Sequence, residues 1–380
     1  MKRLALVVVG SMSLASLSFA ASAVAQAPTL NRDPALARLV TSDLPNFWRA
    51  LDASAGADSA ARVRSIEELY LRPGSPGLRA WVKVRLVDQE AVLAKLDPTV
   101  WPRSRIVAVM RAPGGGPDRP ALEAAAAPYL EHDATEQLAR TVGQVPDYYR
   151  AIRANALSLD TTRAVTDSIR AGFRRFATMY ADAAFPDVYF LVGRLTSGGT
   201  SEPAGLLLGV EVNERGGRTP AGLPMRSTAT PAERTTRYAR IVWHELIHYQ
   251  QHGRGGGTVL DASLGEGAAD FVSGLIAGDA APCAGGSRNA WGIAHEAQLW
   301  SEFRLAASSE KSGEWLYNGG RSGDRPADLG YFMGCRIVAD YYRTSGDKAA
   351  ALRRILARDD AAGLLRESGY GARFGGSGGT

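Results

Sequence analysis

The sequence has few of the residues that define several common classes of protein. It contains only two cysteines, Cys283 and Cys335, and five histidines in 380 residues. Two cysteines exclude a disulfide-rich scaffold and a zinc ribbon held by thiolates. They leave two alternatives, which are a single bridge formed in an oxidising compartment or two unpaired buried thiols.

An excess of one charge is also missing. The formal net charge is +5, and it falls to +3 when residues 1–25 are removed together with Lys2 and Arg3. A chain so close to neutrality, without a block of basic residues, is not expected to bind nucleic acid.

Long apolar runs are absent except at the start. Lys2 and Arg3 precede a mostly apolar stretch over 4–17, and Ala23-Val24-Ala25 has the small residues of a cleavage site. The apolar stretch is too short to span a membrane, and no later run reaches about 18 residues. No cysteine follows the cleavage site, which disfavours a lipoprotein. Residues 1–25 therefore predict a signal peptide and an exported protein, periplasmic or extracellular, with no stable membrane span.

The remaining pattern predicts a predominantly helical α+β fold with a large core, since 45% of the residues are hydrophobic. Residues 26–183 form a mainly helical N-terminal region. There, a short helix is expected near 44–51, and apolar residues recur at helical spacing over 60–70, 82–96, 121–142 and 161–180.

Residues 184–380 combine a small sheet with further helices. The β-rich runs 188–192 and 205–210, joined by a loop over 196–201, predict a hairpin or two neighbouring strands. A polar loop follows over 213–230. Helices are then expected over 231–252, 263–278, 289–307, 327–344 and 347–358.

One motif carries recognisable chemistry. His244-Glu245-Leu246-Ile247-His248 is an HExxH sequence. On a helix its two histidines lie on one face and can bind one metal ion, while Glu245 is placed to act as general base on a water. A capping-box pattern, Thr230-Pro231-Ala232-Glu233, predicts where this helix begins. The alternative is a pair of histidines on a helix surface without a metal.

Catalytic zinc needs a third protein ligand and one open position for water. Glu266 is the strongest candidate, in Ser263-Leu264-Gly265-Glu266, after a glycine-rich loop over 252–260 that lets the chain turn back. The alternative is a capping-box glutamate paired with Ser263. Asp270, one turn later, is expected to accept a hydrogen bond from a ligand histidine, or else to be a surface carboxylate. One Zn²⁺ per chain is thus predicted, on His244, His248 and Glu266.

A tetrahedral oxyanion needs a further stabiliser besides zinc. Tyr331 is assigned this catalytic role, with core packing as its alternative; Tyr317, His295 and Arg325 are the other candidates. His295 has apolar and aromatic neighbours, which favours a buried structural histidine. The strand over 188–192 or 205–210 is expected either to pair with an extended substrate as an edge strand or to be an ordinary core strand.

Several segments resemble a known family. These are WHELIHYQQ (243–251), GEGAADFVSGLIAG (265–278), HEAQLWSEF (295–303), WLYNGG (315–320), RPADLGYFMGCRIVADYY (325–342) and SGY (368–370). They are similar to zinc-dependent proteases related to the gliding-motility protein GldB, over about residues 185–370. The resemblance implies a zincin-like fold and a gluzincin-type peptidase, with His244, His248 and Glu266 as zinc ligands and Glu245 as base. The gap of 17 residues before Glu266 is slightly shorter than in better-known gluzincins.

The sequence therefore predicts an exported zinc metallopeptidase that acts on a peptide or protein. Two alternatives share the metal site: a zinc-containing binding or assembly protein with little turnover, and a hydrolase of non-peptide amides or esters. The loop over 213–230 bears on the first of these, because it would block the cleft of a binding protein. Substrate preference and oligomeric state do not follow from the sequence.

Overall fold

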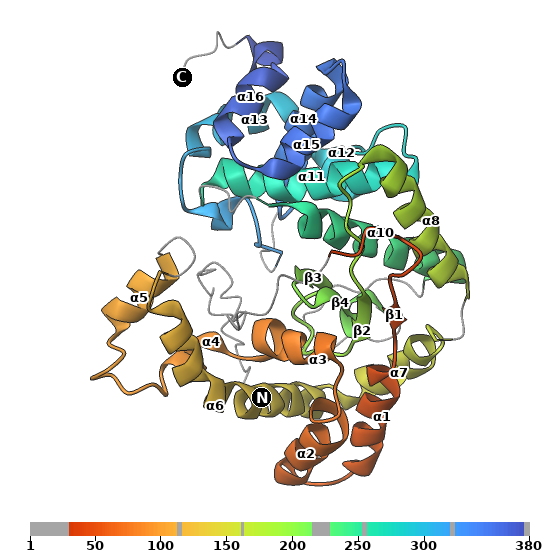
Figure 1. Cartoon of the computed structure of the whole chain (residues 1–380), viewed down its shortest axis with the longest axis vertical. Coiled ribbons are helices and arrows are strands. Elements are labelled where there is room, and N and C mark those ends of the chain that lie inside the picture. The colour runs from red at the N-terminus through yellow and green to blue at the C-terminus, as the bar shows by residue number, and fades with distance from the viewer. Residues whose placement is uncertain are drawn as a thin grey trace.

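The computed structural model describes residues 30–111, 116–160, 163–214, 229–252, 257–319 and 324–375. The predicted signal peptide and most of the loop over 213–230 lie outside these residues. Helices dominate the described chain, and the strands form one small sheet (Figure 1). The fold is thus the predominantly helical α+β fold that the sequence predicts. Within the described residues, no helix is long and apolar enough to cross a membrane.

The N-terminal region is an array of short helices around one long helix. Two of its segments, η1 and η2, are π-helical. The elements are β1 (Leu39–Val40), α1 (Asp43–Ala53), α2 (Ser59–Ile66), η1 (Glu67–Leu71), α3 (Pro76–Trp81), η2 (Val82–Leu86), α4 (Gln89–Leu93), α5 (Arg103–Arg111), α6 (Arg119–Gln144), α7 (Pro146–Leu157) and α8 (Arg163–Met179). The helix expected over 82–96 is wrong as one element, because the backbone turns extended at Val87 before Asp88 caps α4.

The sheet has the order β1-β2-β4-β3, with β2 (Val188–Leu191), β3 (Gly199–Glu202) and β4 (Gly205–Gly209). β2 is parallel to β1 and β4, whereas β3 is antiparallel to β4. The predicted runs are therefore neighbouring strands, and the hairpin alternative is wrong. The loop expected over 196–201 contains the start of β3, because Gly199, Thr200 and Ser201 pair with the three leucines of β4.

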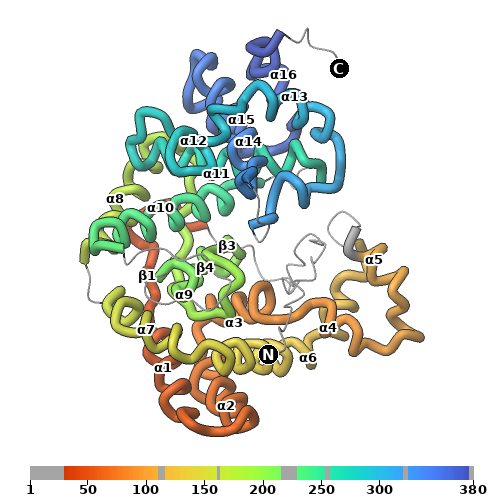
Figure 2. The backbone as a smooth tube through the Cα atoms, turned by 180° about the vertical axis from the view of Figure 1, so that it is seen from behind, coloured from red at the N-terminus to blue at the C-terminus, as the bar shows by residue number. Residues whose placement is uncertain are grey.

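The elements that follow the sheet are helical, and those after residue 230 lie above the sheet in Figure 1 and again in the reverse view of Figure 2. They are α9 (Val210–Asn213), α10 (Pro231–Gln250), α11 (Val259–Ala277), α12 (Gly286–Ala294), α13 (Glu296–Ala306), η4 (Ser312–Glu314), α14 (Leu329–Thr344), α15 (Lys348–Ala357), α16 (Ala361–Ser368) and η5 (Tyr370–Phe374). The single helix expected over 289–307 is wrong, since the chain breaks at His295 between α12 and α13.

The sheet lies between two groups of helices. α10 packs on β3 and β4, while α3 and α1 approach β2 from the N-terminal region. α8 packs along α10. The predicted boundary near residue 183 stays a prediction, although β1 and α8 both belong to the packing around the sheet and α10.

α11 and α14 are in especially close contact. A Cβ added to Gly334 would lie 1.7 Å from the Ser263 carbonyl oxygen, and one on Gly267 would lie 2.1 Å from the Cys335 nitrogen. A disulfide between Cys283 and Cys335 also ties the segment after α11 to α14. The bridged alternative is therefore the one found. Closing a loop of 52 residues stabilises the fold by about 4 kcal/mol in the chain-entropy account.

Candidate metal centre

α10 presents the HExxH motif on one face. The helix begins at a capping box in which Thr230 and Glu233 satisfy each other's backbone N–H groups, with a proline at the first helical position. Four turns later, His244 and His248 lie one turn apart with their ring centroids 4.7 Å from each other. The start predicted from the sequence is correct, and the helix ends two residues earlier than expected.

α11 brings Glu266 to the two histidines. Its Oε2 lies 3.1 Å from His248 Nε2 and 3.4 Å from His244 Nε2, and the two Nε2 atoms are 3.1 Å apart. Only 12–20% of each of these three side chains is exposed. His244, His248 and Glu266 thus form a largely buried group that can hold a metal ion.

The capping-box alternative for Glu266 is wrong. α11 begins at Val259 and is capped by Thr258 with Asp261, so Ser263 and Glu266 lie inside the helix. The helix starts four residues earlier than expected because Thr258-Val-Leu-Asp261 forms its own capping box. Glu266 is therefore free to face α10.

The Nδ1 atom of each histidine lies within hydrogen-bond distance of an acceptor on a neighbouring side chain. His244 Nδ1 lies 3.0 Å from Asp270 Oδ1, the contact that the sequence predicts for Asp270. The other oxygen of Asp270 accepts a hydrogen bond of 2.6 Å from Arg288. A carboxylate only accepts hydrogen bonds, so His244 donates from Nδ1.

His248 has a neutral partner in the same position. Its Nδ1 lies 3.1 Å from Gln251 Oε1. Arg358 donates to that same oxygen at 3.2 Å, and Gln251 Nε2 donates to the Gly265 carbonyl at 2.8 Å. These two contacts fix which end of the Gln251 amide is oxygen. His248 therefore also donates from Nδ1.

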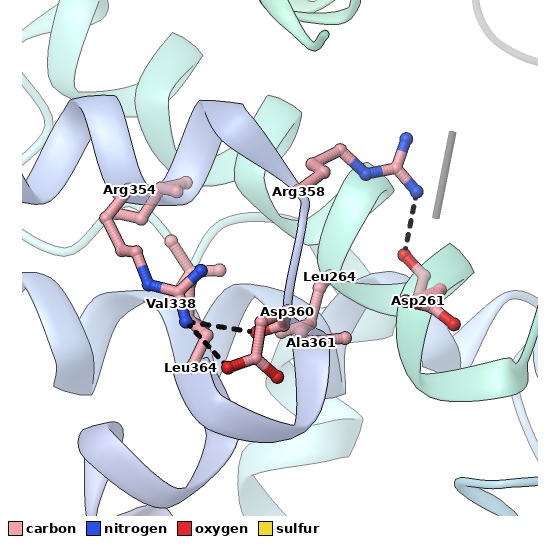
Figure 3. A pocket seen from close by; sticks show the side chains of 9 residues that line it. Asp261, Leu264, Val338, Arg354, Arg358, Asp360, Ala361 and Leu364 are labelled. Atoms are coloured by element: carbon pink, nitrogen blue, oxygen red, sulfur yellow. Dashed lines mark hydrogen bonds and ion pairs between the residues drawn. The ribbon is translucent and has the colours of Figure 1, made fainter. Parts of the chain in front are cut away.

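Arg358 is held on the rim of a small pocket. Its Nη2 donates to the Asp261 carbonyl at 2.9 Å, as Figure 3 shows. Leu264, Val338 and Leu364 form the apolar part of this pocket. The guanidinium thus bridges the first turn of α11 and the residue that follows α10.

These outer contacts determine the chemistry of the centre. With both Nδ1 atoms directed to their outer partners, both Nε2 atoms are directed inward and converge with a Glu266 oxygen. Three electron-pair donors at such distances need a proton or a metal ion among them. Two imidazoles and one carboxylate are a donor set that catalytic zinc uses, with one position left for water.

The charges at the centre follow from burial and from these contacts. Burial alone would raise the pKa of Glu266, but the attraction and the hydrogen bonds of His248 and His244, when these carry a proton, outweigh burial and hold that pKa well below its ordinary value. Burial likewise raises the pKa of Glu245, and there it prevails over the attraction of the histidines. Glu266 is therefore ionised, as a metal ligand would have to be, while Glu245 holds a proton more readily than an exposed glutamate.

Glu245 lies against the edge of the sheet. A Cβ added to Gly199 of β3 would be 2.7 Å from Glu245 Oε1, so a larger residue there would displace the Glu245 carboxylate. In the described part of the sheet β3 is an edge strand, whereas β2 and β4 are both central. The expectation that 188–192 or 205–210 provides the edge is thus wrong, and the alternative of ordinary core strands is the one found. The edges are β1 and β3, and of these β3 packs against α10.

Two of the four candidate stabilisers lie at the centre. Tyr317 donates a 2.7 Å hydrogen bond to Glu266 Oε1. The Tyr331 ring is nearly parallel to the His244 ring, and their centroids lie 6.3 Å apart. The Arg288 guanidinium lies 4.9 Å from the centroid of the same Tyr331 ring. Burial raises the pKa of both hydroxyls, which keeps them protonated donors.

The other two candidates are engaged elsewhere. His295 stacks on Trp291 at 3.9 Å and contacts its carbonyl through Nδ1, so it closes the break between α12 and α13. Arg325 pairs with Glu302 at 2.5 Å and covers Trp315. The structural alternative favoured for His295 is the one found.

Gln251, Arg288 and Arg358 are the site residues that the sequence did not reveal. The sequence could have indicated Gln251 as a partner of His248, since it follows His248 by three residues and its side chain is long enough to reach back to the ring. The two arginines come from distant segments, and nothing in the sequence pattern indicates that they reach the centre.

No family model, curated protein or solved structure matches this chain. The resemblance to GldB-related proteases therefore stays a prediction, and function has to be inferred from the geometry of the centre.

Proposed function

We propose that this protein is an exported zinc-dependent metallopeptidase. The observation that supports this most is the convergence of His244 Nε2, His248 Nε2 and Glu266 Oε2, with Glu245 on the helix that carries the two histidines. A purely structural zinc site would use a fourth protein ligand, and the described residues add none to these three. Export stays a prediction from residues 1–25.

A zinc ion bound there supplies Lewis acidity, which lowers the pKa of a water and polarises a carbonyl. Glu245 accepts the proton of the attacking water and returns it to the leaving amine. Its buried position beside the imidazoles suits this exchange, because burial moves its pKa towards neutrality.

Tyr331 is the proposed donor to the oxyanion. The Tyr317 hydroxyl is already committed to Glu266, whereas the Tyr331 hydroxyl makes no hydrogen bond to another described residue. Its ring contacts both the His244 ring and the Arg288 guanidinium, so these neighbours hold the tyrosine at the centre before a substrate binds.

β3 favours a peptide over another amide or ester. Its free edge lies beside Glu245, and the backbone of an extended chain can add to such an edge by main-chain hydrogen bonds. A substrate bound in this way would run past Glu245. This feature separates the peptidase from a hydrolase of small non-peptide substrates.

The test combines metal analysis with digestion of a peptide library. We expect one zinc per chain and cleavage that falls by roughly 10²- to 10⁴-fold in Glu245→Gln, which keeps the metal. Binding of zinc with cleavage unchanged in Glu245→Gln would overturn the mechanism. Zinc binding without cleavage of any peptide would overturn the peptidase.

Two tyrosine variants separate the roles at the centre. Tyr331→Phe should lower kcat and leave zinc affinity unchanged, because it removes only the donor to the oxyanion. Tyr317→Phe should weaken zinc binding, because it frees one oxygen of Glu266. The reverse pattern would exchange the two assignments.

A further inference from the structure

Arg85 carries a positive charge that the described structure leaves without a partner. It lies in the π-helix η2 and its side chain is partly exposed, yet its Nε is buried and makes no hydrogen bond. Arg288 and Arg358, the other two guanidinium groups at the centre, are both hydrogen-bonded. An unpaired guanidinium with a buried nitrogen costs stability unless a ligand pairs with it.

The backbone of Arg85 is fixed next to the start of the edge strand. Its carbonyl accepts hydrogen bonds from Arg194 Nε at 3.1 Å and from Thr196 Oγ1 at 3.5 Å. Both donors belong to the segment that leads from β2 into β3. Arg85 is thus anchored where a chain paired with β3 would pass.

The charge of Arg85 reaches the catalytic groups from the N-terminal region. Burial is the main influence on Glu245 and Tyr317 and raises both pKa values, while the positive charge of Arg85 acts on each of them in the opposite direction. η2 directly follows α3, which lies across from α11 and α14 in both views (Figures 1 and 2). Thr196, which contacts the Arg85 carbonyl, precedes Gly199 by three residues, and Gly199 lies beside Glu245, so Arg85 belongs to the part of the N-terminal region that adjoins the centre.

We infer that Arg85 binds a carboxylate of the peptide substrate. A guanidinium is planar and matches a carboxylate with two parallel hydrogen bonds, which a lysine cannot do. The carboxylate would be either the free C-terminus of the substrate or an aspartate or glutamate side chain. This inference deepens the proposed peptidase function and rests on it.

The test measures binding separately from cleavage. Zinc-loaded Glu245→Gln is titrated calorimetrically with three versions of one peptide: a free C-terminus without acidic side chains, the same peptide amidated, and the amidated peptide with one glutamate. We expect one carboxylate form to bind roughly 10- to 100-fold more tightly than the neutral peptide, as a charged hydrogen-bonded pair would give. The form that gains tells which carboxylate is recognised.

The second variant in the same background is Arg85→Gln, with Lys83→Gln as the control, which removes a like charge from the same π-helix. Arg85→Gln should abolish the preference, Arg85→Lys should retain a part of it, and Lys83→Gln should leave it intact. Thermal unfolding of each variant checks the fold, and Arg85→Lys serves if Arg85→Gln does not fold.

Three outcomes overturn the inference. The neutral peptide could bind as tightly as the others, Arg85→Gln could keep the preference, or Arg85→Gln with Glu245 present could lower kcat equally for every peptide, which would assign Arg85 to the oxyanion. Failure of the peptidase function is distinguishable, because it would show as absent cleavage by the unmodified protein while the binding preference remained.

Discussion

The two sides of the metal centre differ in how their buried polar groups are satisfied. On the ligand side, formed by His244, His248, Glu266 and the residues that contact them, Asp270 and Gln251 each accept from one histidine and are held in turn by an arginine. Elsewhere on α10 and α11, the hydroxyls of Tyr238 and Ser263 have no such partner. On the facing side, formed by α3, η2, residues 193–198 and α9, three buried side-chain atoms have no hydrogen-bond partner among the described residues. They are Arg85 Nε, Trp81 Nε1 and Glu211 Oε2.

This difference separates two tasks. Ligands that are oriented before the metal arrives bind it without further reorganisation, so the ligand side needs complete hydrogen bonding. Unpaired polar groups lower the stability of the facing side, and such groups are common where a protein meets a ligand or where protonation changes. The hydrogen bonds of the ligand side thus fix the orientation of the ligand atoms, whereas the unpaired groups of the facing side can take up a ligand or a proton.

The largest expected effect breaks the ligand side directly. His248→Ala removes one of three ligand atoms, so metal affinity should fall by more than the roughly 100-fold that loss of an outer partner can cost. Metal content after dialysis and calorimetric titration measure this. His132→Ala is the control, since His132 is exposed and pairs with Glu136 away from the centre. A His248→Ala protein that keeps zinc at full stoichiometry would contradict the assigned ligands.

The next effect tests the packing that holds Glu266 in place. Gly334→Ala puts a methyl group 1.7 Å from the Ser263 carbonyl, so α11 and α14 must move apart. We expect a loss of about 4 kcal/mol or more in the free energy of unfolding, above the roughly 1–3 kcal/mol usual for overpacking.

Urea unfolding measures this loss, and metal affinity should fall with it because α11 carries Glu266. Gly313→Ala is the matched control, since nothing lies within 4 Å of its added Cβ. A loss below about 1 kcal/mol in Gly334→Ala would show that the two helices separate easily.

A third prediction concerns the facing side and its response to pH. Burial raises the pKa of Glu211 to about 7, although the backbone N–H groups of Gly193 and Leu195 oppose the rise. The folded protein therefore binds a proton that the unfolded chain releases near pH 4.5. This contribution to stability is complete below pH 4.5 and is lost as the pH rises to 7, by roughly 3 kcal/mol.

Glu211→Gln should remove that loss. Relative to the unmodified protein, the variant should gain roughly 3 kcal/mol in the free energy of unfolding between pH 5 and pH 8. Denaturant unfolding at both values measures it, and Glu68→Gln on the exposed face of η1 is the control. Equal pH dependence with and without Glu211 would mean that its carboxyl does not titrate in this range.

The sequence predicted the ligand side far better than the facing side, for a physical reason. The HExxH motif and Glu266 are fixed by helical period and short spacing, and the same holds for Asp270 one turn later. Arg288 and Arg358 reach the histidines from other segments, and Arg85 reaches the centre from 160 residues away in the chain. Only tertiary packing brings them there. β3 was missed because Gly199-Thr-Ser-Glu202 has little intrinsic preference for a strand and is held by β4.

Asp270→Asn sharpens the comparison within the ligand side. The variant keeps the shape of the side chain but loses the charge that fixes the His244 tautomer and that Arg288 neutralises. We expect metal affinity to fall roughly 10- to 100-fold, as for other outer partners. Calorimetric titration with zinc measures it, and Asp279→Asn is the control because Asp279 pairs with Arg240 instead. Unchanged affinity would show that the charge of Asp270 does not reach the metal.

Gln251→Ala should have the smallest effect of these. Gln251 is neutral, so its loss removes an acceptor for His248 but no charge, and Arg358 retains the Asp261 carbonyl. A fall of about tenfold in zinc affinity, at the lower end for outer partners, is expected, smaller than for Asp270→Asn. If the two variants weaken zinc equally, orientation of the imidazoles accounts for the whole contribution of the outer residues. If Gln251→Ala weakens zinc binding more than Asp270→Asn does, Arg358 depends on Gln251 for its own position. The neutral contact at His248 then does more than the charged contact at His244 to orient the ligand atoms.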